Sequence, residues 1–124
     1  MADIINVQSP LGYTVVCSQN TWNNHIVINH PIMSNNQNAV INTITDPDEI
    51  YLSNETGNND EERHVYYSKT SGAEYNNNGF MTRVIVELPN PNISVGDIVT
   101  AFPSKTKGGS VINDNKLYER AHKN

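Results

Sequence analysis

The chain has 124 residues, of which 36% are hydrophobic, and its formal net charge is −5. This length suffices for one domain with a single core, and the acidic balance excludes a histone-like protein that coats nucleic acid with a broadly basic surface. The lone cysteine, Cys17, excludes an internal disulfide and a zinc site built from several thiolates.

The charges are unevenly divided along the chain. Residues 1–62 contain eight Asp and Glu residues and no Lys or Arg, whereas residues 63–124 contain all eight Lys and Arg residues and five acids. A site for an anion must therefore draw its cations from the second half. This distribution favours a confined anion-binding site over a broad polyanion-binding surface.

The first predicted elements are a short β-prone run over residues 12–17 and a helix that follows it. Ser18 or Asn20 can cap the start of this helix. Trp22 and the isoleucine four residues later share one helical face, which we expect to be buried. Pro31 ends the helix, because proline lacks an amide proton and disfavours helical geometry in the preceding residue.

A second helix is predicted from Asn36 to Ile44. Its apolar stripe consists of Val40, Ile41 and Ile44. Asp46-Pro47-Asp48 breaks it, and the hydrophobic period then changes from that of a helix to that of a strand.

Four strands are predicted after the helices, over residues 49–53, 63–69, 80–88 and 98–102. Short hairpin-like loops join strands of this kind into an antiparallel sheet. We therefore predict an α+β fold with two N-terminal helices packed on one face of a four-stranded antiparallel sheet. The opposite face would be open, and a site could lie there.

The chain is predicted to form a single domain over residues 1–124, with a core over about residues 12–104. Residues 105–124 form a predicted polar tail, with a short helix from Lys116 to His122. No stretch approaches the roughly 20 apolar residues of a membrane span. The N-terminus lacks the pattern of a signal peptide, so we expect a cytoplasmic protein, or a module delivered from a larger toxin or phage protein, with no membrane partner.

A row of cations accompanies the predicted strands. Alternation places Arg63, Tyr67 and Lys69 on one side of their strand, and Arg83, Lys105 and Lys107 belong to or follow neighbouring strands. Such cations can clamp a phosphodiester, and tyrosine can stack on an unpaired base. The alternative is that they are solvated residues of an ordinary sheet face.

Two histidines and one threonine are further candidates. His25 and His30 are five residues apart, so they would lie about 140° apart on a helix and make a poor metal pair. One or both could be catalytic, or one could pack against the sheet while the other is solvated. Thr100 places a hydroxyl group in an otherwise apolar strand. This hydroxyl could donate a hydrogen bond to a phosphate, or the threonine could be there only because it is a good strand former. No nucleotide or phosphate-cradling motif is present, and we expect no metal and no cofactor.

Five motifs in this order carry a resemblance to a known family: Trp22-x-x-His25-Ile26-x-x-x-His30-Pro31, Asp46-Pro47-Asp48-Glu49-Ile50, Arg63-His64-Val65-Tyr66-Tyr67-Ser68-Lys69, Arg83-Val84-Ile85-Val86 and Val99-Thr100-Ala101-Phe102. Together they resemble the phage-associated branch of the barnase, EndoU, colicin and RelE-like (BECR-fold) nuclease superfamily. The resemblance covers about residues 20–104.

The resemblance implies a ribonuclease that needs no metal. In that chemistry the ribose 2′-hydroxyl attacks the adjacent phosphate and leaves a cyclic phosphate, while a base and an acid move the protons, for which histidine is suited. The residues that match the family's catalytic set are His25, His30, Arg63, Lys69 and Thr100. From strand geometry and the row of cations we add Tyr67, Arg83 and Lys105 as substrate-binding residues.

The expected function is therefore a toxin or phage effector that cleaves RNA, such as tRNA, and that an immunity or antitoxin protein would neutralise. Two alternatives stay open. One is a catalytically inactive module that binds RNA or protein on the same fold. The other is a structural or regulatory phage protein whose exposed sheet face or edge forms an oligomer.

Overall fold

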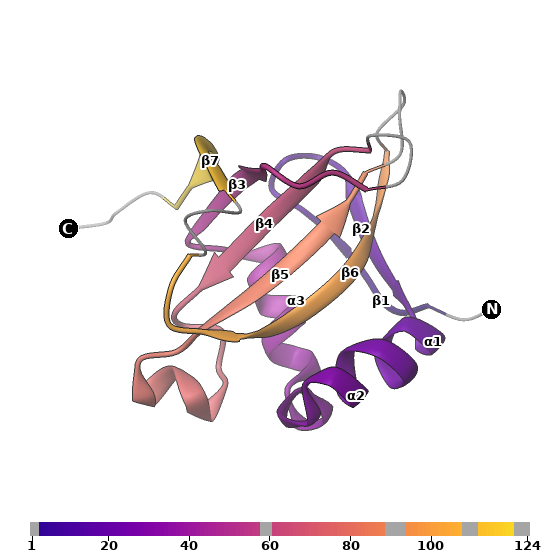
Figure 1. Ribbon diagram of the computed structural model, residues 1–124, viewed down its shortest axis with the longest axis vertical. Helices are drawn as coiled ribbons and strands as arrows, with labels where there is room; N and C mark the ends of the chain where they lie inside the picture. The colour runs from indigo at the N-terminus through magenta and orange to yellow at the C-terminus, as the bar shows by residue number, and fades with distance from the viewer. Residues whose placement is uncertain (1–2, 58–60, 89–93, 108–111, 121–124) are drawn as a thin grey trace.

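A computed structural model describes residues 3–57, 61–88, 94–107 and 112–120. Its centre is one curled, seven-stranded sheet with the order β1-β2-β6-β5-β4-β3-β7 (Figure 1). All neighbouring strands are antiparallel except β2 and β6, which are parallel. The strands are β1 (Asp3–Gln8), β2 (Thr14–Ser18), β3 (Glu49–Ser53), β4 (Arg63–Ser68), β5 (Met81–Glu87), β6 (Val95–Ser104) and β7 (Ile112–Glu119).

The helical segments lie between β2 and β3, apart from one short turn between β4 and β5. Residues 19–29 form one helix of 11 residues that contains a π-helical stretch. The segments are α1 (Gln19–Thr21), η1 (Trp22–Ile26), α2 (Val27–Asn29), the 3-10 turn η2 (Pro31–Asn35), α3 (Gln37–Thr45) and the 3-10 turn η4 (Glu74–Asn78). In Figure 1, α3 lies behind β4 and β5, and α1 and α2 lie at the β6 and β1 side.

The predicted fold is wrong. Instead of two helices on a four-stranded antiparallel sheet, the chain forms a seven-stranded mixed sheet in which only one helix reaches 11 residues. The parallel contact between β2 and β6 joins the N-terminal hairpin to the strands of the second half. A parallel pair needs a long crossover, and the helices together with β3, β4 and β5 supply it.

Both edge strands were missed. β1 is a short run whose β-formers, Ile4, Ile5 and Val7, do not alternate with polar residues, whereas β7 is largely polar. They pair with β2 and β3, respectively. The helix predicted from Lys116 is wrong as far as Glu119, because these residues belong to β7. Residues 108–111 and 121–124 of the predicted tail lie outside the described part of the chain.

Several local predictions are confirmed. The predicted strand over residues 49–53 coincides with β3. The Ser18 hydroxyl accepts a hydrogen bond from the Thr21 amide at 3.1 Å and caps the helix. His30 leaves helical geometry before Pro31, with φ −138° and ψ 78°.

The sheet divides the apolar side chains into two clusters. The main core lies between the sheet and the helices and includes Trp22, Ile44, Tyr66 and Val84, all buried. We call the side of the sheet that faces this core the inner face, and the other side the outer face. A second, smaller cluster covers part of the outer face, with Tyr51, Val65, Tyr67 and Met81 as its buried members. Part of the face that was predicted to be open is therefore apolar, and the apolar side chains there are buried.

Replacing Gly96 with Ala should lower the free energy of unfolding by about 1–2 kcal/mol, because β6 crosses close to the core at this residue. A Cβ atom there would lie 2.6 Å from Val86 Cγ1 and 2.9 Å from Leu88 Cδ2. Urea unfolding of the variant measures the loss. An unchanged midpoint would show that the two side chains move aside freely.

A chain of hydrogen bonds crosses one end of the core between the β1–β2 turn and β4. The Ser9 hydroxyl lies 2.6 Å from the Tyr66 hydroxyl, which donates to the Tyr13 hydroxyl at 2.5 Å. Tyr13 in turn lies 2.7 Å from Nδ1 of His64, whose Nε2 lies 2.5 Å from the Glu62 carboxylate. A carboxylate only accepts, so Nε2 carries the proton and Nδ1 accepts from Tyr13.

Burial controls the protonation of this chain. It raises the pKa of Tyr13 and of Tyr66, so both hydroxyls remain donors at neutral pH. Burial also lowers the pKa of His64, and the hydrogen bond to Glu62 opposes this shift without cancelling it. The chain therefore runs in one direction, from Ser9 as the first donor to Glu62 as the last acceptor.

Candidate functional site

The outer face carries a row of side chains from four neighbouring strands. Glu49 of β3 pairs with Tyr67 of β4. Arg83 of β5 pairs with Tyr67 on one side and with Phe102 of β6 on the other. We call these four residues the outer row. Directly paired residues have Cβ atoms about 5 Å apart, so Tyr67 and Arg83, both predicted to bind substrate, are immediate neighbours.

Arg83 is a buried cation without a counterion in the described part of the chain. Arg83 is 8% exposed, and its Nε atom has no hydrogen-bond partner among the described residues. Its guanidinium carbon lies 5.2 Å from the centre of the Phe102 ring, a cation–π contact. Because an unpaired buried charge is costly, Arg83 has an unused capacity to bind an anion.

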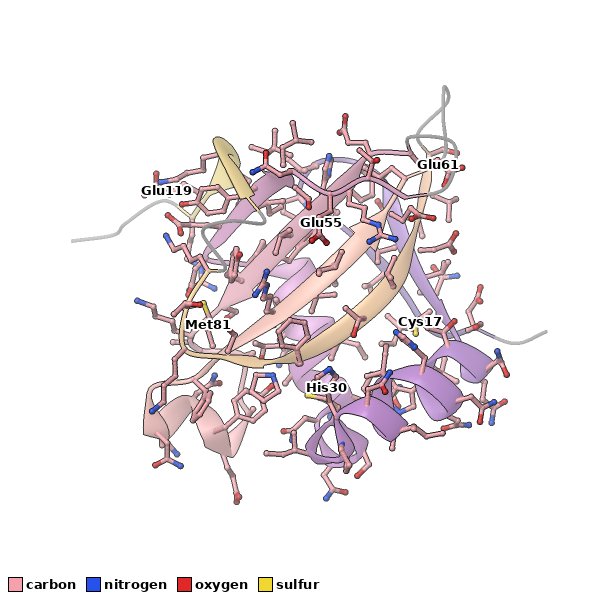
Figure 2. All side chains as sticks on the ribbon, in the orientation of Figure 1. Cys17, His30, Glu55, Glu61, Met81 and Glu119 are labelled. Carbon is pink, nitrogen blue, oxygen red and sulfur yellow. The ribbon has the colours of Figure 1, made fainter. Side chains whose placement is uncertain are left out.

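His30 extends the outer row beyond β6. Its ring stacks on Phe102 with the two centres 5.0 Å apart and the planes at 23°. Figure 2 shows His30 at the end of the 19–29 helix, beside β6. The helix that Pro31 terminates therefore delivers an imidazole to the edge of the outer face, where it forms an aromatic pair next to Arg83.

The other end of the outer row is held by Lys107. The buried Tyr67 hydroxyl donates to the Lys107 carbonyl, and the Lys107 ammonium pairs with Glu49 and donates to the Tyr51 hydroxyl at 3.1 Å. Burial alone would raise the pKa of Glu49, but hydrogen bonds from Lys107 and Lys116 lower it below its ordinary value. Burial raises the pKa of Tyr67 to about 12, so its hydroxyl is a donor at neutral pH.

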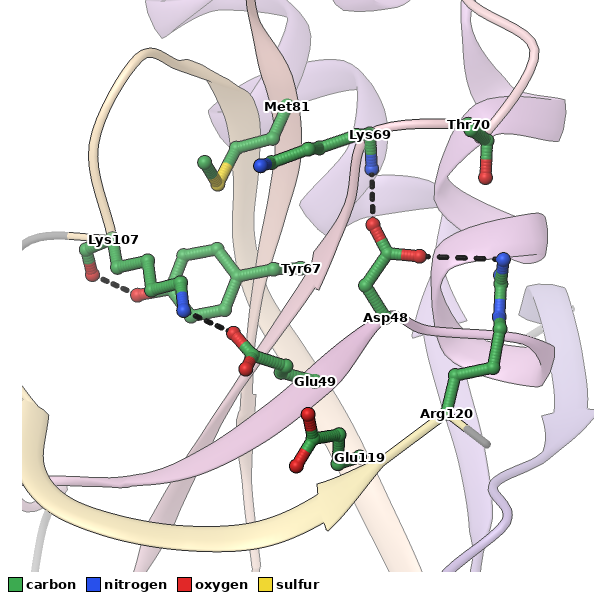
Figure 3. Close-up of a pocket in the computed structure, with 9 residues that line it drawn as sticks. All are labelled: Asp48, Glu49, Tyr67, Lys69, Thr70, Met81, Lys107, Glu119 and Arg120. Atoms are coloured by element: carbon green, nitrogen blue, oxygen red, sulfur yellow. Dashed lines mark hydrogen bonds and ion pairs between the residues drawn. The ribbon is translucent and has the colours of Figure 1, made fainter. Parts of the chain in front are cut away.

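A pocket of about 380 Å³ opens next to Tyr67, where β4 ends (Figure 3). β3 and β7 form one wall, and the start of β5 contributes Met81. The lining residues are Asp48, Glu49, Tyr67, Lys69, Thr70, Met81, Lys107, Glu119 and Arg120. Lys69, a predicted catalytic residue, extends its side chain across this pocket toward Met81 (Figure 3).

Most of the cations in the described part of the chain are already neutralised. The structure describes seven of the eight Lys and Arg residues, and four of these form ion pairs with carboxylates: Arg63, Lys107, Lys116 and Arg120. Among the described residues, the other three have no carboxylate partner: Lys69, Arg83 and Lys105. The basic surplus of the second half is therefore confined to a few positions.

The structure does not bring Arg63 and Lys69 to one point. Arg63 begins β4, and its Nε donates to Glu87 at 3.0 Å. Lys69 follows the last residue of β4, six positions further along. At about 3.3 Å per residue their backbones lie about 20 Å apart, too far for both side chains to contact one phosphate from a single β-strand face.

The remaining predicted residues have different neighbours. His25 is exposed on the helix, with its Nδ1 atom 3.3 Å from the Asn29 side-chain amide. Thr100 pairs with Ile85 on β5 and is half-buried. The Lys105 ammonium lies 5.1 Å from the centre of the Phe80 ring. Of the predicted set, His30 and Arg83 contact Phe102, Thr100 lies two residues before it on the same face of β6, and Tyr67 lies beyond Arg83 with Lys69 in the adjacent pocket.

One residue of this site, Phe102, was missed from the sequence. It lies two residues after Thr100, and strand alternation alone could have placed it on the same face. Lys107 belonged to the predicted row of cations, but its pairing with Glu49 could not have been predicted, because the two residues are far apart in the sequence.

No group of three or more His, Cys, Asp or Glu residues arranged to hold a metal ion occurs within residues 3–57, 61–88, 94–107 and 112–120. Over the same ranges, no helix combines the length and apolar character needed to cross a bilayer. No family model, no curated protein and no solved structure matches the chain.

Proposed function

We propose that the outer face of the sheet binds a short segment of single-stranded RNA, with Arg83 contacting a phosphate. The observation that carries the proposal is the nearly complete burial of this guanidinium without a carboxylate among the described residues. A phosphate oxygen would supply the missing charge and accept from the unused donors, because guanidinium and phosphate form charge-assisted hydrogen bonds.

The aromatic pair beside Arg83 supports RNA over a bare anion. His30 and Phe102 are already stacked, and an unpaired base can extend such a stack. The distribution of charge supports a small footprint. Of the three described cations without a carboxylate partner, Arg83 lies in the outer row and Lys69 in the adjacent pocket, so one or two phosphates can be contacted at full strength.

Replacing Arg83 with Gln should weaken binding of a single-stranded RNA decamer at least tenfold, through the loss of about 1.5–3 kcal/mol of charge-assisted hydrogen bonding. Arg63→Gln is the matched control, because it also removes an arginine from the outer face but one that Glu87 already neutralises. It should weaken binding less than threefold. Fluorescence anisotropy with labelled RNA measures both, and equal effects of the two variants would contradict a special role for Arg83.

The salt dependence of the same binding reports the number of phosphates contacted. A footprint of one or two phosphates predicts a slope of log K against log salt of about −0.7 to −1.4 for a single strand. A much steeper slope would mean that the ion-paired lysines also contact the backbone.

RNA cleavage through His25, His30, Arg63, Lys69 and Thr100 stays a prediction of the resemblance. Incubation of the purified protein with total RNA, with and without EDTA, tests it directly. If the protein cleaves RNA in the presence of EDTA and the His30→Ala variant does not, the protein is a metal-independent ribonuclease as well as an RNA-binding protein. Intact RNA under conditions where the decamer binds would leave a binding module.

A further inference from the structure

The pocket beside Tyr67 has a definite chemical preference. Its three carboxylates are already engaged: Glu49 pairs with Lys107 and with Lys116, the latter at 3.0 Å, and Glu119 pairs with Lys116 at 3.2 Å. Asp48 accepts from the Lys69 backbone amide at 2.8 Å and lies 3.4 Å from Arg120. These acceptors have little left to offer a ligand.

The hydrogen-bonding groups that remain unused around the pocket are donors. Within the described residues, the Lys69 ammonium has no carboxylate partner and the Thr70 hydroxyl has no hydrogen bond. A ligand that satisfies this set must be rich in acceptors, which means an anion.

The position of the pocket relative to Arg83 suggests which anion. Met81 lines the pocket and lies two residues before Arg83 on the same face of β5, about 7 Å away along the strand. Tyr67 lines the pocket as well and pairs directly with Arg83. A strand of RNA held at Arg83 would therefore reach the pocket with its next phosphate.

The far wall of the pocket argues for a chain end. In the strand order, β3 and β7 lie on the side away from β5, and they or their flanks contribute Asp48, Glu49 and Glu119. The described cations on this side, Lys107, Lys116 and Arg120, are all paired with carboxylates, so none is left to hold a phosphodiester chain that continued across this wall. A strand that ends at Lys69 needs no further contact, and its terminal phosphate has more charge and more acceptor oxygens than a diester.

We propose that this pocket binds the terminal phosphate monoester of an RNA strand, with the Lys69 ammonium as the main contact. The proposal rests on the RNA binding inferred for the outer row and adds to it a preference for phosphorylated ends.

The test compares RNA decamers of one sequence that carry a 5′-phosphate, a 3′-phosphate or hydroxyls at both ends. One phosphorylated form should compete for the protein about tenfold better than the hydroxyl form, the worth of one charge-assisted contact. Lys69→Gln should reduce this ratio to about one. Lys105→Gln removes an exposed lysine outside the pocket, so any loss of affinity should be the same for all three decamers and the ratio should stay unchanged. Equal affinities of all three decamers would overturn the proposal.

A second measurement separates the pocket from the outer row. Titration with uridine 5′-monophosphate should shift the backbone amide signals of Lys69 and Thr70 in nuclear magnetic resonance spectra, and uridine should not. If no decamer binds, RNA binding at the outer row fails, while monophosphate-specific shifts still support a phosphate monoester in the pocket. If the monophosphate shifts neither amide, the pocket proposal is overturned whatever the decamers do.

Discussion

Replacing Tyr66 with Phe should lower the free energy of unfolding by about 2–4 kcal/mol, although it removes a single oxygen atom. The Tyr66 hydroxyl accepts from Ser9 and donates to Tyr13, and all three residues are buried. Without it, two buried hydroxyls lose a partner in a region that water does not reach. Urea unfolding followed by the fluorescence of Trp22 measures the loss as a lower midpoint at constant slope.

Tyr118→Phe is the matched control. Tyr118 is half-buried, and among the described residues its hydroxyl forms no hydrogen bond. The same deletion should change stability by less than about 0.5 kcal/mol there, as surface substitutions commonly do. A Tyr66→Phe loss no larger than that of the control would show that the hydrogen-bonded chain adds nothing to stability.

The buried chain also bears on the proposed RNA site, because both use β4. His64 and Tyr66 point to the inner face and bond to the β1–β2 turn, whereas Tyr67 points to the outer face beside Arg83. A shift of β4 by one residue would exchange the two faces. The hydrogen bonds on the inner side therefore fix the register that places the outer row.

The central strands could be predicted from the sequence because their signal is local. β3, β4 and β5 alternate or are rich in β-formers, and each was predicted within two residues of its observed bounds. β1 was missed although half of its residues, Ile4, Ile5 and Val7, are β-formers, because the run is short and does not alternate. The largely polar β7 could not be predicted in this way: it forms a strand because β3 supplies hydrogen-bond partners, and that pairing is not encoded in the segment alone.

The candidate site shows the same division. Alternation sufficed to place Arg63, Tyr67 and Arg83 on the outer face. It could not distinguish the two arginines, because the difference comes from register: Arg63 lies opposite Glu87 and is neutralised, whereas Arg83 lies opposite Tyr67 and is not. The positive surplus of the second half likewise overstated the basic surface, since ion pairs with Asp46, Asp48 and Glu49 connect the two halves.

Lowering the pH from 7.5 to 5.5 should destabilise the protein through His64. In the unfolded chain this imidazole takes up a proton below about pH 6.5, whereas burial lowers its pKa in the folded protein. The unfolded state therefore binds more protons in this range, and stability falls as the pH falls, by at most about 1.4 kcal/mol per pH unit. Stopping at pH 5.5 limits the contribution of Asp97, whose pKa is raised by burial and which acts in the opposite sense.

Urea unfolding at each pH measures this slope. His25→Gln should keep it, because His25 is exposed, and His64→Gln should flatten it. If His64→Gln does not fold, the imidazole signals of His64 in the wild-type protein give its titration directly. A flat wild-type profile would mean that Glu62 compensates for burial, so that His64 takes up its proton at the same pH in the folded and the unfolded protein. Below that pH the charged imidazole would donate from both nitrogens, so Tyr13 would have to turn its proton toward Tyr66, and Tyr66 toward Ser9. The pH series therefore determines whether the buried chain keeps its hydrogen-bond direction at pH 5.5.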